Sequence, residues 1–172
     1  MDYIFLSGIH GVGKSTLAKE LKNSVDIKSI PVSDLIRQAG IKLDNSNKKT
    51  ENISKNQELW KNELNNLNLG MSKLLLDGHF CLLDKDKNIT PLHFSTFDGT
   101  NMVKIIFMKN SPSIIRERLL KRDKTDYSVE LLENLQICEM QQAMKYSTEN
   151  GIDLFIYDEK QPLSELLNFI TN

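Results

Sequence analysis

The stretch Gly8-Ile9-His10-Gly11-Val12-Gly13-Lys14-Ser15 determines how the rest of this chain is interpreted. It matches the pattern GxxxxGK[ST] in full, and Thr16 follows it. The apolar residues 3–7 before it predict a buried strand, and residues 14–23 after it carry apolar side chains at helical spacing. A glycine-rich turn between a strand and a helix is the setting in which this pattern indicates a phosphate-binding loop.

Each residue type in this loop suits the binding of a polyphosphate. Glycines let backbone N–H groups approach phosphates without obstruction by side chains, and the helix N-terminus adds positive potential. Lys14 is expected to bridge the outer phosphates, and the hydroxyl of Ser15 to ligate Mg²⁺. The loop is not a dinucleotide-binding fingerprint, because GxGxxG requires glycine where Thr16 stands. The predicted ATP phosphate-binding residues are Gly8, Gly11, Val12, Gly13, Lys14, Ser15 and Thr16.

The composition is that of one ordinary folded domain. Of 172 residues, 26% are charged and 40% are hydrophobic, and the net charge of -1 predicts neither a nucleic-acid nor a membrane partner. Cys81 and Cys138 have neither a disulfide-framework pattern nor zinc-ligand spacing. No apolar run approaches the ~20 residues of a membrane span, so we expect a cytoplasmic protein.

Downstream of the loop, the first half of the chain predicts a strand, two helices and a polar loop. Residues 29–32 form a candidate strand, and Ser33 or Asp34 is expected to cap a helix that runs through Arg37 and Ala39. Residues 44–55 are polar and without periodicity, which predicts a mobile loop. A helix over 57–69 is expected to end at Gly70 in the left-handed conformation.

The second half of the chain continues the alternation of strands and helices. Predicted strands cover 73–77, 102–108 and 152–157, predicted helices cover 111–122, 128–149 and 163–170, and residues 81–83 and 89–92 predict a hairpin. The expected buried stripe of the long helix consists of Leu131, Leu135 and Cys138, then Ile137, Met140 and Met144. This order predicts an α/β, three-layer P-loop NTPase fold with a five-stranded parallel sheet and helices on both faces.

Ligands of such sheets bind beyond the carboxyl ends of the strands, where three further polar residues are expected. Asp77 ends an apolar strand as a Walker B carboxylate does, and would hold Mg²⁺ through water; the alternative is a cap of the next turn. His79 follows two residues later and either faces the site or packs in the core. For His10, inside the loop, we expect the backbone to matter more than the imidazole.

Arginine is scarce in a chain that otherwise prefers lysine. There are 18 lysines and only four arginines, and Arg116, Arg118 and Arg122 lie within seven residues, with Arg37 the fourth. A planar, permanently charged guanidinium binds phosphate or carboxylate through two hydrogen bonds, so these positions are candidates for anion binding. The alternative is that the three clustered arginines form the solvent-exposed face of a helix.

Several of these segments together resemble the nucleoside monophosphate kinases. They are the phosphate loop, Ser33-Asp34-Leu35-Ile36-Arg37, Leu76-Asp77-Gly78 and the arginine-rich helix end at 118–123. The sequence is most similar to the archaeal-type adenylate kinases and their small bacterial relatives, in which a D-x-H strand end precedes a short hairpin and a helical stretch. The likeness covers most of the chain.

The resemblance implies a single P-loop kinase domain over residues 1–172 that uses ATP and Mg²⁺ and takes nucleotide substrates. It implies an acceptor-binding helical segment at 33–70, where Ser33, Asp34 and Arg37 match the acceptor-binding motif, and a short lid at 118–127. Within that motif, Ser33 and Arg37 match the residues that bind the acceptor's phosphate, and Asp34 matches the carboxylate that holds water on Mg²⁺. By the same resemblance, the catalytic residues are Lys14 with the lid arginines Arg118 and Arg122, and the metal-binding residues are Ser15 and, through water, Asp77.

Three departures from the family pattern lie on the acceptor side and the lid. Ser33 stands in place of a glycine, residues 77–81 contain no arginine, and Lys124, Thr125 and Asp126 replace a further lid arginine.

Three functions are therefore carried forward. The first is ATP-dependent phosphoryl transfer to a nucleoside monophosphate, with AMP as the first expectation. The second is a P-loop kinase for a nucleoside, sugar or other small metabolite. The third is an NTP-binding regulatory module with slow hydrolysis that signals through residues 41–56.

Overall fold

The computed structural model describes residues 1–38, 53–84 and 86–172. Within them the elements alternate between strands and helices along almost the whole chain. In order they are β1 (Asp2–Ser7), α1 (Lys14–Lys22), β2 (Ile27–Pro31), α2 (Val32–Gln38), α3 (Ile53–Asn66), β3 (Lys73–Gly78), β4 (Cys81–Leu83), β5 (Ile89–Pro91), the 3₁₀ helix η1 (Phe94–Phe97), β6 (Asn101–Lys109), α4 (Pro112–Asp123), α5 (Val129–Asn150), β7 (Asp153–Asp158) and α6 (Leu163–Thr171).

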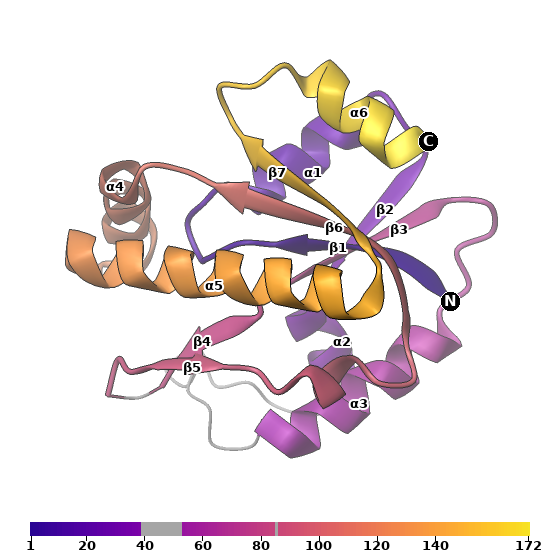
Figure 1. Ribbon diagram of the computed structural model, residues 1–172, viewed down its shortest axis with the longest axis horizontal. Helices are drawn as coiled ribbons and strands as arrows, with labels where there is room; N and C mark the ends of the chain where they lie inside the picture. The colour runs from indigo at the N-terminus through magenta and orange to yellow at the C-terminus, as the bar shows by residue number, and fades with distance from the viewer. Residues whose placement is uncertain (39–52, 85) are drawn as a thin grey trace.

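The main sheet has five strands in the order β2-β3-β1-β6-β7, and every neighbouring pair is parallel. Helices α1 and α6 cover one face, and α2, α3 and α5 cover the other (Figure 1). The short strands β4 and β5 form a separate antiparallel hairpin, as predicted. The predicted three-layer P-loop NTPase fold is therefore confirmed.

The hydrophobic core has two halves, one on each face of the sheet. Successive side chains of a strand point to opposite faces, and β1 shows this directly. Ile4 and Leu6 pack on the side of α1 and α6, whereas Tyr3 and Phe5 pack on the side of α2, α3 and α5. All four are buried, so β1 is covered on both faces and anchors the loop that follows it.

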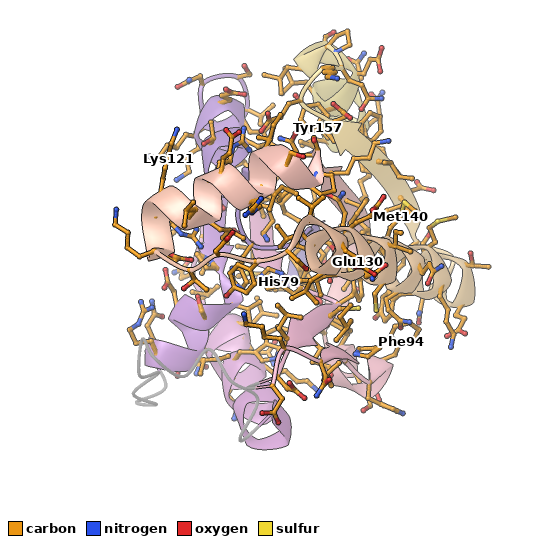
Figure 2. All side chains as sticks on the ribbon, turned by 90° about the vertical axis from the view of Figure 1, so that its left-hand side faces the viewer. His79, Phe94, Lys121, Glu130, Met140 and Tyr157 are labelled. Carbon is orange, nitrogen blue, oxygen red and sulfur yellow. The ribbon has the colours of Figure 1, made fainter. Side chains whose placement is uncertain are left out.

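The pairing of β1 with β3 brings the phosphate loop and Asp77 to the same edge of the sheet. In this register Leu6 lies beside Asp77 and Ser7 beside Gly78, one residue before the loop begins. Figure 2 looks onto this edge and places His79 near its middle. The predicted position of the site, at the carboxyl ends of the strands, follows from this pairing.

The start of α2 differs from the sequence prediction. β2 begins at Ile27 and α2 begins at Val32, directly after Pro31, so Ser33 and Asp34 lie inside the first turn instead of capping it. Proline has no N–H for the ladder, and its fixed φ suits the start of a helix. The predicted continuation through Ala39 lies outside the described residues.

Helix α3 is placed earlier in the chain than predicted. It spans Ile53–Asn66 instead of 57–69, so the last residues of the predicted polar loop are helical; residues 44–52 lie outside the described part. Gly70 has the expected left-handed φ of 60°, but it belongs to a turn beyond the helix end.

Helix α5 buries a different stripe from the predicted one. Its buried side chains are those of Leu132, Leu135, Glu139, Ala143 and Tyr146. Ile137 and Met144 are exposed, so that part of the prediction is wrong. Apolar residues occur on more than one face of this helix, and its buried stripe contains the carboxylate of Glu139. A search for apolar periodicity leaves such a residue out.

Candidate functional site

The phosphate loop is built on glycines in conformations that other residues adopt rarely. Gly8 and Gly13 have φ of 147° and 120°. A Cβ on Gly8 would lie 2.6 Å from the carbonyl oxygen of Met108, and a Cβ on Gly13 would lie 2.7 Å from Glu159 Oε1. Both positions therefore favour glycine for its backbone freedom, and Gly8 also requires it for space, because its neighbour is a backbone atom. Between them, Val12 is buried and anchors the loop in the core.

Lys14 is the first residue of α1, and its side chain is only 7% exposed. Its ammonium donates a hydrogen bond to the carbonyl oxygen of Gly8 and lies 3.5 Å from Asp77 Oδ1. Burial lowers the pKa of Lys14, while the charges of Asp77 and Glu139 oppose that change. The loop thus encloses a largely desolvated cation beside a carboxylate, at the N-terminus of a helix.

Asp77 lies at the end of β3 and faces the loop from the neighbouring strand. Burial raises the pKa of Asp77, the ammonium of Lys14 lowers it, and the charge of Asp34 raises it further. The hydroxyl-bearing Ser15 and Thr16 follow Lys14 in α1 and are exposed.

The oxygen donors available to a metal ion are the hydroxyl of Ser15 and the carboxylate of Asp77. Mg²⁺ prefers oxygen ligands, usually retains water, and is typically held by one or two carboxylates together with substrate phosphates. These two donors therefore have the chemistry that Mg²⁺ requires. In the described ranges, no group of three or more His, Cys, Asp or Glu side chains forms a metal-binding cluster.

Arg118 binds the phosphate loop itself. Its Nη1 donates to the carbonyl oxygen of Val12 at 2.8 Å and, more weakly, to that of Gly11 at 3.5 Å. The same guanidinium forms two hydrogen bonds of 3.0 Å to the carboxylate of Glu159, in the loop after β7. The structure therefore brings the predicted catalytic Arg118 together with the phosphate loop and with the loop after β7.

The other two clustered arginines pair with acidic residues near the end of α4. Arg122 forms two hydrogen bonds to Asp123, and Arg116 forms two to Asp126. Both side chains are exposed to solvent, that of Arg122 by 52% and that of Arg116 by 44%. This exposure agrees with the alternative expectation of a solvent-exposed helix face, and a catalytic role of Arg122 remains a prediction. The predicted lid at 118–127 starts inside α4, and its closure over a substrate remains a prediction.

The predicted acceptor-binding residues lie together on α2. Arg37 Nη1 donates to Asp34 Oδ1 at 2.7 Å, and both side chains are exposed to solvent. Ser33 precedes Asp34 in the first turn. Binding of an acceptor by these three residues remains a prediction, as does the acceptor segment at 33–70, part of which lies outside the described residues.

Two histidines meet across the site. The rings of His10, in the phosphate loop, and His79, after β3, have centroids 4.3 Å apart. The side chain of His79 therefore faces the loop, which was one of the two sequence expectations. The imidazole of His10 thus has a defined neighbour, and the expectation that its backbone matters more than its imidazole remains a prediction.

Sequence reasoning missed Glu139, although this residue hydrogen-bonds to the start of the phosphate loop and to the turn after β3. Its buried carboxylate accepts hydrogen bonds from Ser7, Gly8, Phe80 and Cys81. The available signal was a glutamate in register with Leu132, Leu135 and Ala143 on one face of a helix. A charged residue at such a position is almost never buried unless it is paired.

The two cysteines, predicted to form neither a disulfide framework nor a zinc site, are neighbours in space. Sγ of Cys81 and Sγ of Cys138 are 2.6 Å apart, and both cysteines are free thiols. They join the hairpin to α5, next to Phe80 and Glu139 in the sequence. Burial raises the pKa of the Cys81 thiol.

The fold and the glycine loop define a P-loop, kinase-like α/β domain. The sequence model of the family described as "AAA domain" matches residues 7–136, which is more than half of the chain. The chain therefore belongs to the AAA domain family. The match includes the phosphate loop, α2 and the strand that ends at Asp77.

Among solved structures, a gluconokinase from Sinorhizobium meliloti 1021 is similar to this chain. The two share 15% sequence identity with a TM-score of 0.50, and the alignment covers 97% of this chain and 87% of the other. At this identity the likeness shows a common fold. No curated protein matches the sequence significantly.

None of the helices in the described part of the chain is both long and apolar enough to span a membrane.

Proposed function

We propose that this chain is an ATP-dependent small-molecule kinase that transfers the γ-phosphoryl group to an acceptor bound beside α2. The observation that carries the proposal is the buried ammonium of Lys14, held inside the glycine loop and 3.5 Å from Asp77. A desolvated cation at a helix N-terminus stabilises polyphosphate more strongly than an exposed one, because water screens it less. The phosphates would replace Gly8 and Asp77 as partners of Lys14.

The remaining charges support phosphoryl transfer. In that reaction negative charge spreads over the equatorial oxygens of the moving group, so catalysis depends on positioning and on neutralising charge. Mg²⁺ held by Ser15 and, through water, Asp77 would supply part of that neutralisation. Arg118, which binds the loop carbonyls, and Arg122, in the last turn of α4, are the protein groups proposed to supply the rest.

The acceptor side favours a hydroxyl group as the nucleophile. A hydroxyl must lose its proton during attack on phosphorus, whereas the oxygen of a phosphate group is already deprotonated. We assign the role of proton acceptor to Asp34, a solvent-exposed carboxylate in the first turn of α2. Arg37, which now pairs with Asp34, would bind an anionic group of the same acceptor. A hydroxy acid or a phosphorylated metabolite meets both requirements.

A second candidate is a nucleoside monophosphate, with AMP first. The sequence resemblance to the adenylate kinases supports it, and so does Arg37, because its guanidinium suits the acceptor's phosphate. This candidate assigns no proton transfer to Asp34. The two acceptor classes therefore differ in what Asp34 is needed for.

The test is a coupled assay of ADP release with two panels of acceptors, compared with the rate without acceptor. One panel contains hydroxy acids and sugars, with gluconate included because a similar solved structure is a gluconokinase; the other contains nucleoside monophosphates. Phosphorus NMR then distinguishes a new phosphate monoester from a nucleoside diphosphate. We expect turnover with a hydroxyl acceptor, and loss of that turnover in Asp34→Asn.

Two other outcomes of this assay would support the nucleoside monophosphate kinase or the regulatory module instead. Turnover with a nucleoside monophosphate alone would replace the hydroxyl acceptor by AMP or a relative. ADP release that no acceptor increases would contradict a kinase and favour the NTP-binding regulatory module. The proposed signalling segment of that module, 41–56, lies largely outside the described residues.

A further inference from the structure

Glu139 is a fully buried carboxylate in the middle of α5. On the same face of the helix its neighbours are the apolar Leu135, one turn before, and Ala143, one turn after. The side chain nevertheless remains fully hydrogen-bonded. Burial raises the pKa of Glu139, and hydrogen bonds from Ser7, Phe80 and Cys81 and the charge of Lys14 oppose that change.

The carboxylate joins two segments that are far apart in the sequence. From the end of β1, Ser7 Oγ donates to Oε1 at 2.5 Å and the N–H of Gly8 donates to the same oxygen at 3.3 Å. From the turn after β3, the N–H of Phe80 is shared between both oxygens at 2.8 and 2.9 Å, and the N–H of Cys81 donates to Oε2 at 2.6 Å.

These two segments adjoin Lys14 and Asp77, the buried ion pair of the candidate active site. Gly8 is the first glycine of the phosphate loop, and its carbonyl oxygen accepts the hydrogen bond from Lys14. Asp77 lies on β3, the strand that pairs with β1, and Phe80 follows it by three residues in the turn after that strand. The relative position of Lys14 and Asp77 therefore depends on how the ends of β1 and β3 are held together beyond their last paired residues, Ser7 and Gly78.

The donor set requires a carboxylate. Three of the four partners are backbone N–H groups, which can only donate, and together with the hydroxyl they use several of the lone pairs that an ionised carboxylate offers. An amide would turn an NH₂ group toward one of the segments and leave a buried N–H without an acceptor. Aspartate would retain the charge on a side chain shorter by one methylene group.

We infer that Glu139 is a positioning residue for phosphate binding: it holds the first glycine of the loop against the segment that follows Asp77, and so sets the geometry of Lys14. This inference rests on the proposed nucleotide site. It differs from a purely structural role, in which Glu139 would stabilise the fold but leave nucleotide affinity unchanged.

The first experiment compares Glu139→Gln with Ala143→Gly, a change on the same buried face of α5 that weakens the helix but removes no hydrogen bond to either segment. Both proteins are brought to temperatures at which they are fully folded, and the dissociation constant for MgATP is measured by calorimetry. We expect Glu139→Gln to raise that constant by at least about tenfold, since the negative charge is lost and a buried N–H group is left without its acceptor. Ala143→Gly should bind as the wild type does.

Glu139→Asp provides the conservative variant, and it should recover part of the lost affinity. Equal affinity in Glu139→Gln, Ala143→Gly and wild type would overturn the inference. If the wild type itself does not bind MgATP, the proposed function fails instead, and the two failures are thus distinguishable.

A second experiment needs no variant and remains decisive if Glu139→Gln does not fold. Amide hydrogen exchange of the wild type is followed at Gly8, Phe80 and Cys81 by NMR. If one carboxylate holds all three groups, the three amides should exchange through one common opening and show matching protection. Protection of Phe80 and Cys81 with free exchange at Gly8 would show that Glu139 does not hold the loop, and would also overturn the inference.

Discussion

At the scale of single residues, Lys14 combines burial with positive charge. A buried ammonium is costly unless it is paired, and here the carbonyl of Gly8 and the carboxylate of Asp77 provide the pairing. Both partners are groups that a polyphosphate can replace, since phosphate oxygens are stronger acceptors for an ammonium than a carbonyl oxygen. The Lys14 ammonium is thus preorganised to bind an anionic ligand.

Replacement of Lys14 by methionine tests whether the charge of Lys14 is needed for phosphate binding. Methionine fills a similar volume without the charge, so we expect the fold to remain and ADP formation to fall by about 10²-fold or more, because one charge-stabilising group is removed. Lys19→Met, on the exposed face of the same helix, is the matched control. Circular dichroism establishes folding and the coupled assay gives the rate. Turnover retained in the Lys14 variant would contradict the assignment of the loop.

Arg37 provides the residue-scale test of the acceptor side. In Arg37→Ala we expect the acceptor KM to rise by about tenfold or more while the KM for ATP changes little, because a hydrogen-bonded charge on the acceptor loses its partner. Arg116→Ala removes a similarly exposed ion pair on α4 and should leave both constants near their wild-type values. Equal losses for acceptor and ATP in Arg37→Ala would place Arg37 elsewhere in the reaction.

At the scale of elements, the order of strands and helices was predictable because periodicity and glycine signals lie close together in the sequence. β1, the phosphate loop and α1 were recognisable from one continuous segment, and Ser128 and Gly151 mark the two ends of α5. The start of α2 was placed incorrectly because the strand ends at a proline that also suits a helix. The buried face of α5 was placed incorrectly because its central residue is Glu139.

The cap of α5 at Ser128 is a sequence signal whose contribution to stability can be measured. The hydroxyl of Ser128 accepts a hydrogen bond from the N–H of Leu131 at 3.1 Å, which satisfies one of the unpaired N–H groups of the first turn. We expect Ser128→Ala to lower the free energy of unfolding by about 1 kcal/mol in urea titrations. Ser164→Ala, at an exposed position in the first turn of α6, should change that free energy by less than about 0.5 kcal/mol. Similar effects of the two changes would show that the cap does not stabilise α5.

At the scale of the whole molecule, the site depends on contacts that no local pattern contains. Asp77 and Lys14 could be predicted because each lies at a recognisable end of an element. Their convergence with Glu139 depends on the parallel pairing of β1 with β3 and on how α5 packs against the sheet, which join residues up to 132 positions apart. The ion pair between Arg118 and Glu159 likewise depends on how α4 packs beside the loop after β7.

This convergence makes folding stability depend on pH in a defined direction. Burial raises the pKa of Asp77 and of Glu139 in the folded chain. Between the ordinary carboxyl pKa and the raised one, the folded chain binds more protons than the unfolded chain, so the stability contributed by each group is lost as pH rises. Lys14 has the opposite effect, since a lowered pKa makes the unfolded chain bind more protons.

The variant Asp77→Asn isolates one of these contributions. It removes a carboxyl group with a raised pKa, and it also removes a partner of Lys14, which lowers the pKa of Lys14 further; both changes make the slope of stability against pH less negative. We therefore expect the free energy of unfolding of Asp77→Asn, measured by urea titration between about pH 4 and pH 8, to fall less with rising pH than that of the wild type. Asp153→Asn, at an exposed position at the start of β7, should follow the wild-type slope. Parallel curves for Asp77→Asn and wild type would mean that Asp77 titrates alike in the folded and unfolded chains, and its assignment to a desolvated pair with Lys14 would then be wrong.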